Sequence, residues 1–130
     1  MADAVTTQVI DDGLRNYVVH LTNVSDGTGE TDVTKIDIST LSNASTGAAP
    51  TSLALNEASW SIPAGSVKLA WDATTDDTMI VMSGNGGVSF DSVGSLQDPQ
   101  SSGTTGDVKL STVGFASNDT YDITLVFTKK

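Results

Sequence analysis

Short apolar runs that alternate with polar residues are the feature that most constrains the fold of this chain. They recur along its 130 residues, and turns rich in Gly, Asp and Ser separate them. Side chains of a β-strand point alternately to its two faces, so a two-residue period predicts strands that are buried on one face. The clearest such strand spans Val33 to Leu41, and another strong one spans Tyr121 to Phe127. The sequence therefore predicts an all-β protein.

The same pattern predicts eight or nine short strands, within residues 5–10, 14–24, 33–41, 52–62, 67–71, 78–82, 88–90, 108–110 and 121–127. Residues 14–24 also fit helical spacing, but their Val and Thr content and the turns on both sides favour a strand. Asp12-Gly13 predicts a tight hairpin, because glycine supplies the positive φ that such a turn needs. Further turns are expected at 63–65, 73–77 and 83–87, and loops at 23–30, 42–51 and 94–106.

Many short strands joined by such turns are typical of a single-domain antiparallel β-sandwich or small barrel. A chain of this length is long enough to bury one core, whereas two halves would each be too small to bury their own sheets. We expect residues 1–12 to form an N-terminal arm or edge strand and residues 13–130 to form the β-sandwich domain, within one domain overall.

The composition argues against several classes of function. The chain has no Cys, a single His, and six basic against sixteen acidic residues, which gives a formal net charge of −10. The absence of Cys rules out disulfides and thiol chemistry. Nucleic-acid binding is not expected because it needs clustered Lys and Arg. No apolar run reaches the length of about 18 residues that a membrane span needs, and the first residues do not resemble a secretory signal.

Two acidic segments invite a metal-binding interpretation. Asp26, Glu30 and Asp32 place oxygen ligands in a glycine-containing loop, as calcium loops do, but the spacing does not match the twelve-residue helix-loop-helix pattern. Asp72, Asp76 and Asp77 form a second acidic turn. The competing interpretation of both is a solvated loop in which Asp side chains bond the local backbone. We predict no metal ligands.

Candidate catalytic groups are few. Residues 84–87, Gly-Asn-Gly-Gly, superficially resemble a phosphate-binding loop, but Ser89 stands where the dinucleotide motif needs Gly, so a turn is the favoured interpretation. His20 lies within an alternating run, and no Gly-x-Ser-x-Gly motif accompanies it, which favours a hydrogen-bonded structural role. Paired carboxylates can hydrolyse glycosides, but here most Asp lie in predicted turns. The sequence therefore predicts a non-enzymatic protein with no catalytic or cofactor-binding residues.

The two Trp residues allow two interpretations. Trp71 alternates with Val67 and Leu69 and is expected in the core. Trp60 lies between Ser59 and Ser61, so it fits either the core or an exposed platform on which a sugar ring could stack.

The order of several segments resembles small virion structural proteins of tailed bacteriophages. The resemblance runs through residues 2–30, Val33-Thr-Lys-Ile-Asp-Ile-Ser, Leu69-Ala-Trp-Asp-Ala-Thr-Thr-Asp-Asp, the turn from Ser83 and the Asp98-Pro-Gln-Ser-Ser-Gly loop, and so covers most of the chain. These proteins are similar to head decoration (cement) proteins. The resemblance implies a location on the outer capsid surface after synthesis in the host bacterial cytoplasm, the major capsid protein as partner, and self-association, commonly as a homotrimer. It implies no catalytic residues and no cofactor.

Capsid decoration is therefore the first expectation, with residues 2–12 contacting the capsid or neighbouring subunits. A phage tail, baseplate or fibre component has the same composition and is the first alternative. A carbohydrate-binding or adhesin-like β module is the second, and an exposed Trp60 would favour it.

Overall fold

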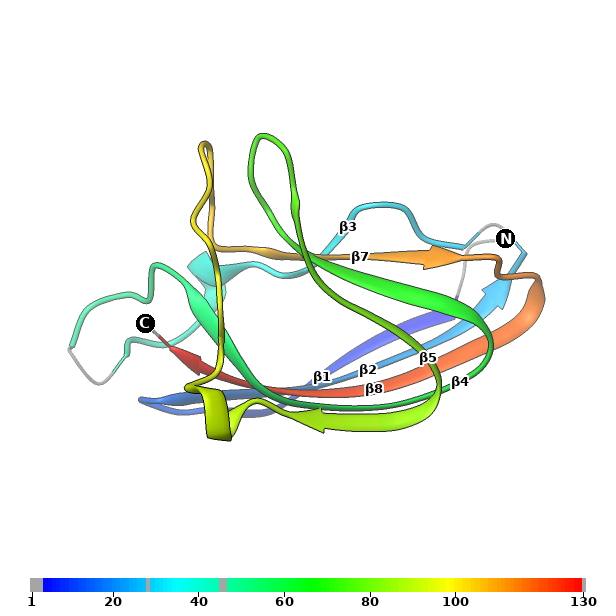
Figure 1. Ribbon diagram of the computed structural model, residues 1–130, viewed down its shortest axis with the longest axis horizontal. Helices are drawn as coiled ribbons and strands as arrows, with labels where there is room; N and C mark the ends of the chain where they lie inside the picture. The colour runs from blue at the N-terminus through cyan, green and yellow to red at the C-terminus, as the bar shows by residue number, and fades with distance from the viewer. Residues whose placement is uncertain (1–3, 28, 45–46, 130) are drawn as a thin grey trace.

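The computed structural model describes residues 4–27, 29–44 and 47–129 (Figure 1). These residues form eight strands: β1 (Ala4–Asp12), β2 (Asn16–Asp26), β3 (Val33–Ile36), β4 (Leu53–Trp71), β5 (Asp77–Ser89), β6 (Leu96–Gln97), β7 (Val108–Val113) and β8 (Ser117–Lys129). Two short 3₁₀ turns, η1 (Ile38–Thr40) and η2 (Asp91–Val93), complete the elements of the described ranges. All the strand pairs found are antiparallel. The predicted all-β antiparallel fold is confirmed.

The strands form two layers of one strongly bent sheet. The lower layer contains β1, β2, β8 and residues 53–62 of β4, with β6 and residues 84–89 of β5 on the far side of β4. The upper layer contains β3, β7, residues 66–71 of β4 and residues 77–82 of β5. Figure 1 shows β4 and β5 curving from one layer into the other. These two long strands therefore join the layers of the sandwich along one side.

The bend lies where the sequence predicts turns at 63–65 and 83–87, and those two predictions are wrong. Ile62 pairs with Gly84 and Val67 with Met82, so residues 63–66 of β4 lie opposite the single residue Ser83. Extra residues on one strand bend it and increase its twist. Gly65 adopts a φ of 72°, and a Cβ at this position would lie 2.5 Å from the carbonyl oxygen of Val113. The Pro and Gly residues at these positions therefore accompany a bend in each strand and do not reverse the chain.

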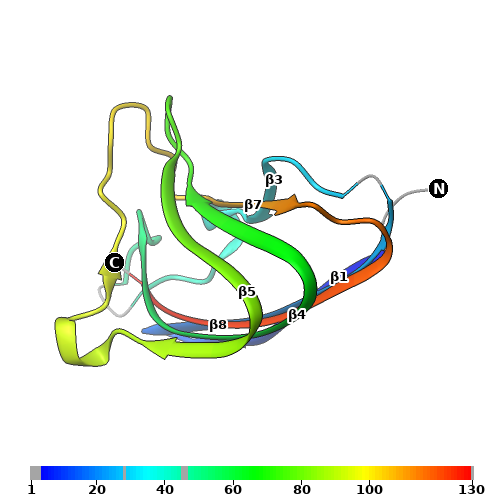
Figure 2. The same ribbon diagram turned by 45° about the vertical axis from the view of Figure 1, so that its right-hand side comes forward.

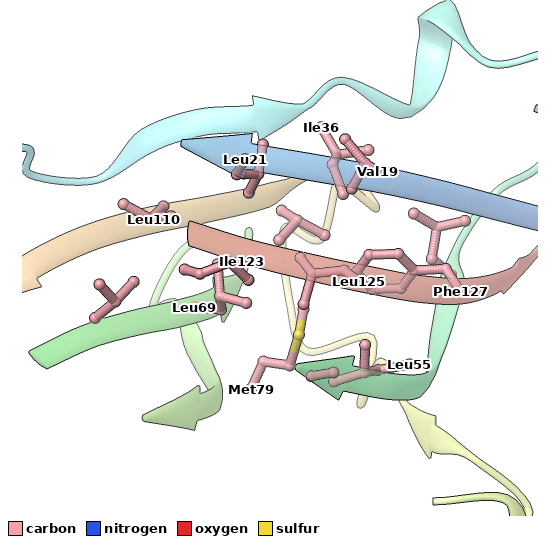
Figure 3. Packing of buried hydrophobic residues seen from close by; sticks show 14 of the residues in the cluster. Val19, Leu21, Ile36, Leu55, Leu69, Met79, Leu110, Ile123, Leu125 and Phe127 are labelled. Carbon is pink, nitrogen blue, oxygen red and sulfur yellow. The ribbon is translucent and has the colours of Figure 1, made fainter. Parts of the chain in front are cut away.

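The core fills the space between the two layers. Inward residues of β2 and β8, such as Val19, Leu21 and Leu125, face Ile36 of β3 and Leu110 of β7 (Figure 3). All five are at most 1% exposed. Trp71 is also 1% exposed and packs edge-on against Phe127, with 6.3 Å between the ring centroids. This confirms its predicted place in the core. In the described ranges, no helix has the length and apolarity to cross a membrane.

The strand predicted over residues 33–41 is shorter than expected. β3 ends at Ile36, and the Asp37 side chain then accepts a hydrogen bond from the Ser39 backbone N–H at 3.0 Å, which starts the turn η1. Asp side chains commonly compete with sheet ladders in this way. Ile38 remains buried, so the apolar pattern identified burial correctly although the backbone leaves the sheet.

A buried lysine ties the end of β1 to the end of β8. The Lys129 side chain is 0% exposed, and its Nζ donates to Asp12 Oδ1 and, at 2.9 Å, to the carbonyl oxygen of Ser42. The Ser42 backbone N–H in turn donates to the Asp12 carboxylate. Burial alone would raise the pKa of Asp12, but the hydrogen bonds from Lys129 and Ser42 outweigh it and hold the pKa below its ordinary value of 3.8.

This tie predicts acid-sensitive stability. Because the pKa of Asp12 is lowered in the folded state, the unfolded chain takes up the proton first as the pH falls. The contribution of Asp12 is complete above the unfolded pKa, near 3.8, and is lost as the pH falls through the lower folded value. Asp12→Ala should cost about 2 kcal/mol at neutral pH, less than a fully buried pair because Asp12 is partly exposed.

Urea unfolding at neutral pH and at a pH of about 3 measures this effect. The loss caused by Asp12→Ala should shrink at the lower pH, and Asp11→Ala, at an exposed neighbouring position, is the control. An equal loss at both pH values would contradict the predicted role of the Asp12 charge.

Candidate binding surfaces

The first candidate surface is the outer edge of β1. β1 stands at one end of the strand order and pairs with β2, and within the described residues no strand pairs with its other side. Figure 2 shows β1 in the lower layer, with β4 and β8. Residues 5–11 are all exposed, so the upper layer, which ends at the four-residue strand β3, leaves β1 uncovered. A row of backbone N–H and C=O groups is thereby left open to another strand. We name residues 5–10 with this open side the β1 edge.

Exposed apolar side chains gather beside this edge. Val5 is 46% exposed and Val9 is 50% exposed, and both pair with inward residues of β2, Asn23 and Val19 respectively. Ile10 is 56% exposed and is the extra residue of a bulge between Val9 and Asp11. Two further apolar side chains near this edge are exposed: Leu14, in the turn between β1 and β2, and Val24, in β2. The β1 edge therefore combines open backbone groups with apolar side chains.

The β1 edge also carries no charge. Residues 4–10 read Ala-Val-Thr-Thr-Gln-Val-Ile, in a chain whose formal net charge is −10. Natural edge strands usually avoid strand addition by means of charged residues, Pro or bulges. β1 has a bulge at Ile10, but residues 5–9 contain neither a charged residue nor a proline. This edge has the properties of a strand that pairs with a partner.

The second candidate surface is a polar hollow on the outer face of the lower layer. Its volume is about 290 Å³, and it is lined by Ser59, Trp60, Ser61, Gly86, Asp122 and Thr124. The register pairs Ser59 with Thr124 and Ser61 with Asp122, so two short rows of polar side chains flank it. Hydroxyl and carboxylate groups in a hollow can hydrogen-bond a polar ligand. We name it the outer hollow.

Trp60 does not point into the outer hollow as a free aromatic platform. It pairs with Ile123 and alternates with Ser59 and Ser61, so its side chain lies on the inner face of the sheet. There the indole lies against Gly86, where a Cβ would approach three indole atoms at 3.1–3.3 Å. Its Nε1–H donates to the carbonyl oxygen of Ser83 at 3.0 Å. Trp60 is half-buried, and its polar neighbours lie on the opposite face.

His20 lies on the same outer face and bonds across the sheet. Its Nε2 is 2.5 Å from Asp122 Oδ1, and the two side chains are 28% and 60% exposed. Exposed ion pairs contribute little to stability. The hydrogen-bonded role expected for His20 agrees with this contact, and the pair forms one border of the outer hollow through Asp122.

The first acidic segment is organised around an internal ion pair. Glu30 is buried and accepts hydrogen bonds from Asn23 Nδ2 at 3.0 Å and Tyr121 OH at 2.6 Å, while its second oxygen lies 2.5 Å from Lys35 Nζ. Asp32 is held separately, since its N–H donates to Ser111 Oγ at 2.9 Å. Glu30 therefore anchors this loop to the core. The sequence offers a calcium loop or a solvated loop, and neither describes the buried contacts of Glu30.

The second acidic turn is closed by a lysine. Lys109 Nζ lies 2.9 Å from Asp72 and 3.5 Å from Asp76, and Thr105 Oγ1 donates to Asp72 at 2.6 Å. The hydrogen bonds from Thr105 and Lys109 hold the pKa of Asp72 below its ordinary value, and Asp72 raises the pKa of Lys109. Asp77 lies apart, in a hollow with Thr74, Thr75, Ser101 and Ser102. Within the described ranges, no three His, Asp or Glu residues are grouped to hold a metal ion.

The glycine run at 84–87 is part of β5 and pairs with β4 from Ser59 to Ile62. It neither precedes a helix nor forms the tight turn that the sequence predicts. Gly84 does adopt a positive φ of 64°, at the bend, and Gly86 makes room for the indole of Trp60.

Of the arm or edge strand predicted over residues 1–12, residues 4–12 form β1 and residues 1–3 lie outside the described part of the chain. Sequence reasoning also singled out Trp60 but missed Ser59, Ser61, Asp122 and Thr124 as one surface. These four residues come from two strands that are far apart in the chain, so only the pairing of β4 with β8 brings them together. In the sequence, only their outward positions in alternating runs indicated that these residues lie on a sheet surface.

Comparisons with known proteins do not assign the chain to a family. No family model and no curated protein matches it. Among solved structures, a cupin superfamily protein from Desulfitobacterium hafniense DCB-2 is similar with 9% identity and a TM-score of 0.38, over 99% of this chain and 80% of that one. A family 29 carbohydrate binding module is similar with 9% identity and a TM-score of 0.43, over 95% and 88% of the two chains. These similarities are too remote to assign a function.

The packing of Trp60 on Gly86 predicts a spectroscopic effect. In Gly86→Val the added side chain should displace the indole and raise its exposure, with a loss of about 1–3 kcal/mol of stability from overpacking. Acrylamide quenching of tryptophan fluorescence measures the exposure, because Trp71 is buried and contributes little to the change. Thr78→Val, at an exposed position of the same strand, should leave quenching unchanged. Equal quenching in the two variants would contradict the assigned packing.

Proposed function

We propose that this protein is a non-enzymatic structural subunit that adheres to a protein shell, as a capsid decoration protein of a tailed bacteriophage. The observation that carries the proposal is the β1 edge, an uncharged strand with open backbone groups and exposed valines. The resemblance of the sequence to small virion structural proteins supplies the setting. In this proposal the partner is the major capsid protein, and the protein lies on the outer capsid surface.

Adhesion through the β1 edge would combine two kinds of contact. Backbone hydrogen bonds to an added strand supply affinity, and the side chains that alternate along the edge supply specificity. Val5 and Val9, half exposed in the free chain, would then lose contact with water. Contacts repeated over a shell of identical subunits act together, so a weak single contact is sufficient.

The acidic surface is compatible with this location. A net charge of −10 disfavours contact with packaged DNA, since binding to phosphates needs clustered cations. A tail, baseplate or fibre location would use the same edge, and the position of the protein in a cryo-EM map of the virion distinguishes these locations from the capsid surface.

Capsid binding can be tested with a matched pair of lysine substitutions. Val9→Lys places a charge on the β1 edge and should weaken binding to undecorated capsids about tenfold or more. Val81→Lys is the control, since Val81 is 60% exposed on β5, away from this edge. Co-sedimentation with capsids measures both. Equal binding by the two variants would show that the β1 edge is not the capsid-binding surface.

Substitution is preferable to deletion of residues 2–12. β1 pairs with β2 from Ala4 to Asp12, and Asp12 holds the buried Lys129, so deletion would uncover β2 and leave a buried charge without its carboxylate.

A carbohydrate-binding module is the second candidate function, and the outer hollow is the observation that favours it. Sugar hydroxyls could bond Ser59, Ser61, Thr124 and the Asp122 carboxylate. The position of the Trp60 indole on the opposite face removes the stacking surface expected from the sequence, so this candidate depends on polar contacts alone.

The two candidates predict opposite results for two variants. If the chain binds carbohydrate in the outer hollow, Asp122→Ala should lower affinity for a glycan found by array screening about tenfold, since the carboxylate bond is lost. Val9→Lys should leave that affinity unchanged. Isothermal titration calorimetry measures both, and a screen without any bound glycan would remove the second candidate.

A further inference from the structure

We infer that the β1 edge binds the β1 edge of a second copy of this chain, in antiparallel pairing about a two-fold axis at Thr7. The inference shares with the proposed function the premise that the β1 edge is a protein-contact surface. It names a second copy as the occupant of that edge in the free protein, and capsid binding through the same edge would have to displace this copy. Three properties of the edge support the inference: the order of its side chains, its lack of charge, and the bulge that limits its length.

The side-chain order of the β1 edge is nearly symmetric about Thr7. Residues 5–9 read Val-Thr-Thr-Gln-Val. Antiparallel pairing of two copies at Thr7 places Val5 of one copy opposite Val9 of the other, twice, and Thr6 opposite Gln8, twice. Residues directly opposite in an antiparallel pair point to the same face. The apolar pairs therefore share the inner face and the polar pairs share the outer face.

The inner face of this pairing matches the exposure of the single chain. Val5 and Val9 are half exposed because the upper layer does not cover β1. Two copies would place two Val5–Val9 pairs on the uncovered inner face, one on each side of the Thr7–Thr7 pair, and cross-strand pairs of β-branched residues stabilise a sheet. The open backbone groups of both copies would be paired by the same contact.

The lack of charge at the β1 edge favours a second copy over a basic partner. Two chains that each carry a net charge of −10 repel one another over most of their surfaces. Residues 4–10 are free of charge, so two such strands approach without like charges opposite one another. The nearest described carboxylate, Asp11, lies beyond the bulge, and the next one, Asp12, is bonded to Lys129.

The bulge fixes the length of the contact. The ladder between β1 and β2 shifts register between Val9 and Asp11, so β1 bends after Val9. Pairing is thereby confined to residues before the bulge, with Thr7 at its centre. A two-fold contact uses the β1 edge of both copies and leaves neither open, so it stops at two chains.

Single-cysteine variants test this geometry, because the chain has no Cys of its own. In Thr7→Cys the two thiols lie directly opposite across the axis, at a Cα separation of about 4.5–5.5 Å that a disulfide can bridge. Mild oxidation should link most of this variant into covalent pairs. Val81→Cys, exposed on β5, is the control and should give about tenfold less linked chain under the same conditions. Equal linking of the two variants would overturn the inference.

Light scattering after size exclusion supplies a second, independent measurement. The unmodified chain should show a concentration-dependent mass approaching twice 13.4 kDa. Val9→Lys should raise the dissociation constant about tenfold or more, because the two-fold axis repeats each altered pair, whereas Val81→Lys should not change it. A monomer at all concentrations, or a trimer, would overturn two-fold pairing.

Failure of self-pairing and failure of capsid binding can be told apart. Pairing that depends on Val9, without binding to capsids, supports the inference and removes the proposed function. Capsid binding that depends on Val9 by a chain that stays monomeric does the reverse.

Discussion

The bend shared by β4 and β5 is the constraint on which the rest of the structure depends. Each of these strands pairs in the lower layer and again in the upper layer, so the sandwich has a continuous side in place of two separate sheets. The bend needs extra residues on one strand, at 63–66, and a glycine where the chain passes close to Val113. A packed core then forms between the two arms of the bend, with residues from both arms buried within it.

The unequal size of the two layers follows from this arrangement and creates the candidate surfaces. Beyond β4, the lower layer continues through β8 and β2 to β1, whereas the upper layer continues through β7 and ends with the short strand β3. β1 therefore lacks a cover on its inner face and a neighbour at its edge. The apolar residues that would be core positions in a larger sandwich remain exposed, which links the architecture directly to the proposed contact with another protein chain.

Three lysines hold acidic residues in place at loops and strand ends of this acidic chain. Lys35, Lys109 and Lys129 each contact at least one carboxylate, and each pair fixes a loop or strand end: the loop before β3, the turn after β4 and the end of β1. Breaking such a pair would leave a partly buried charge, so these contacts keep the loops in place. The acidic segments that suggested calcium are better explained by these lysines, which lie elsewhere in the sequence.

The sequence by itself determined the class of fold, most of the strands and the burial of Trp71, because side-chain alternation is a local property that follows directly from the geometry of a strand. It also singled out residues 2–12, because their Thr- and Val-rich character favours a strand. Only the tertiary structure decided that residues 63–65 and 83–87 bend strands, that Glu30 faces Lys35, and that Ser59 and Asp122 share a hollow. These outcomes depend on which strands become neighbours, and neighbour choice is set by long-range packing that no local pattern encodes.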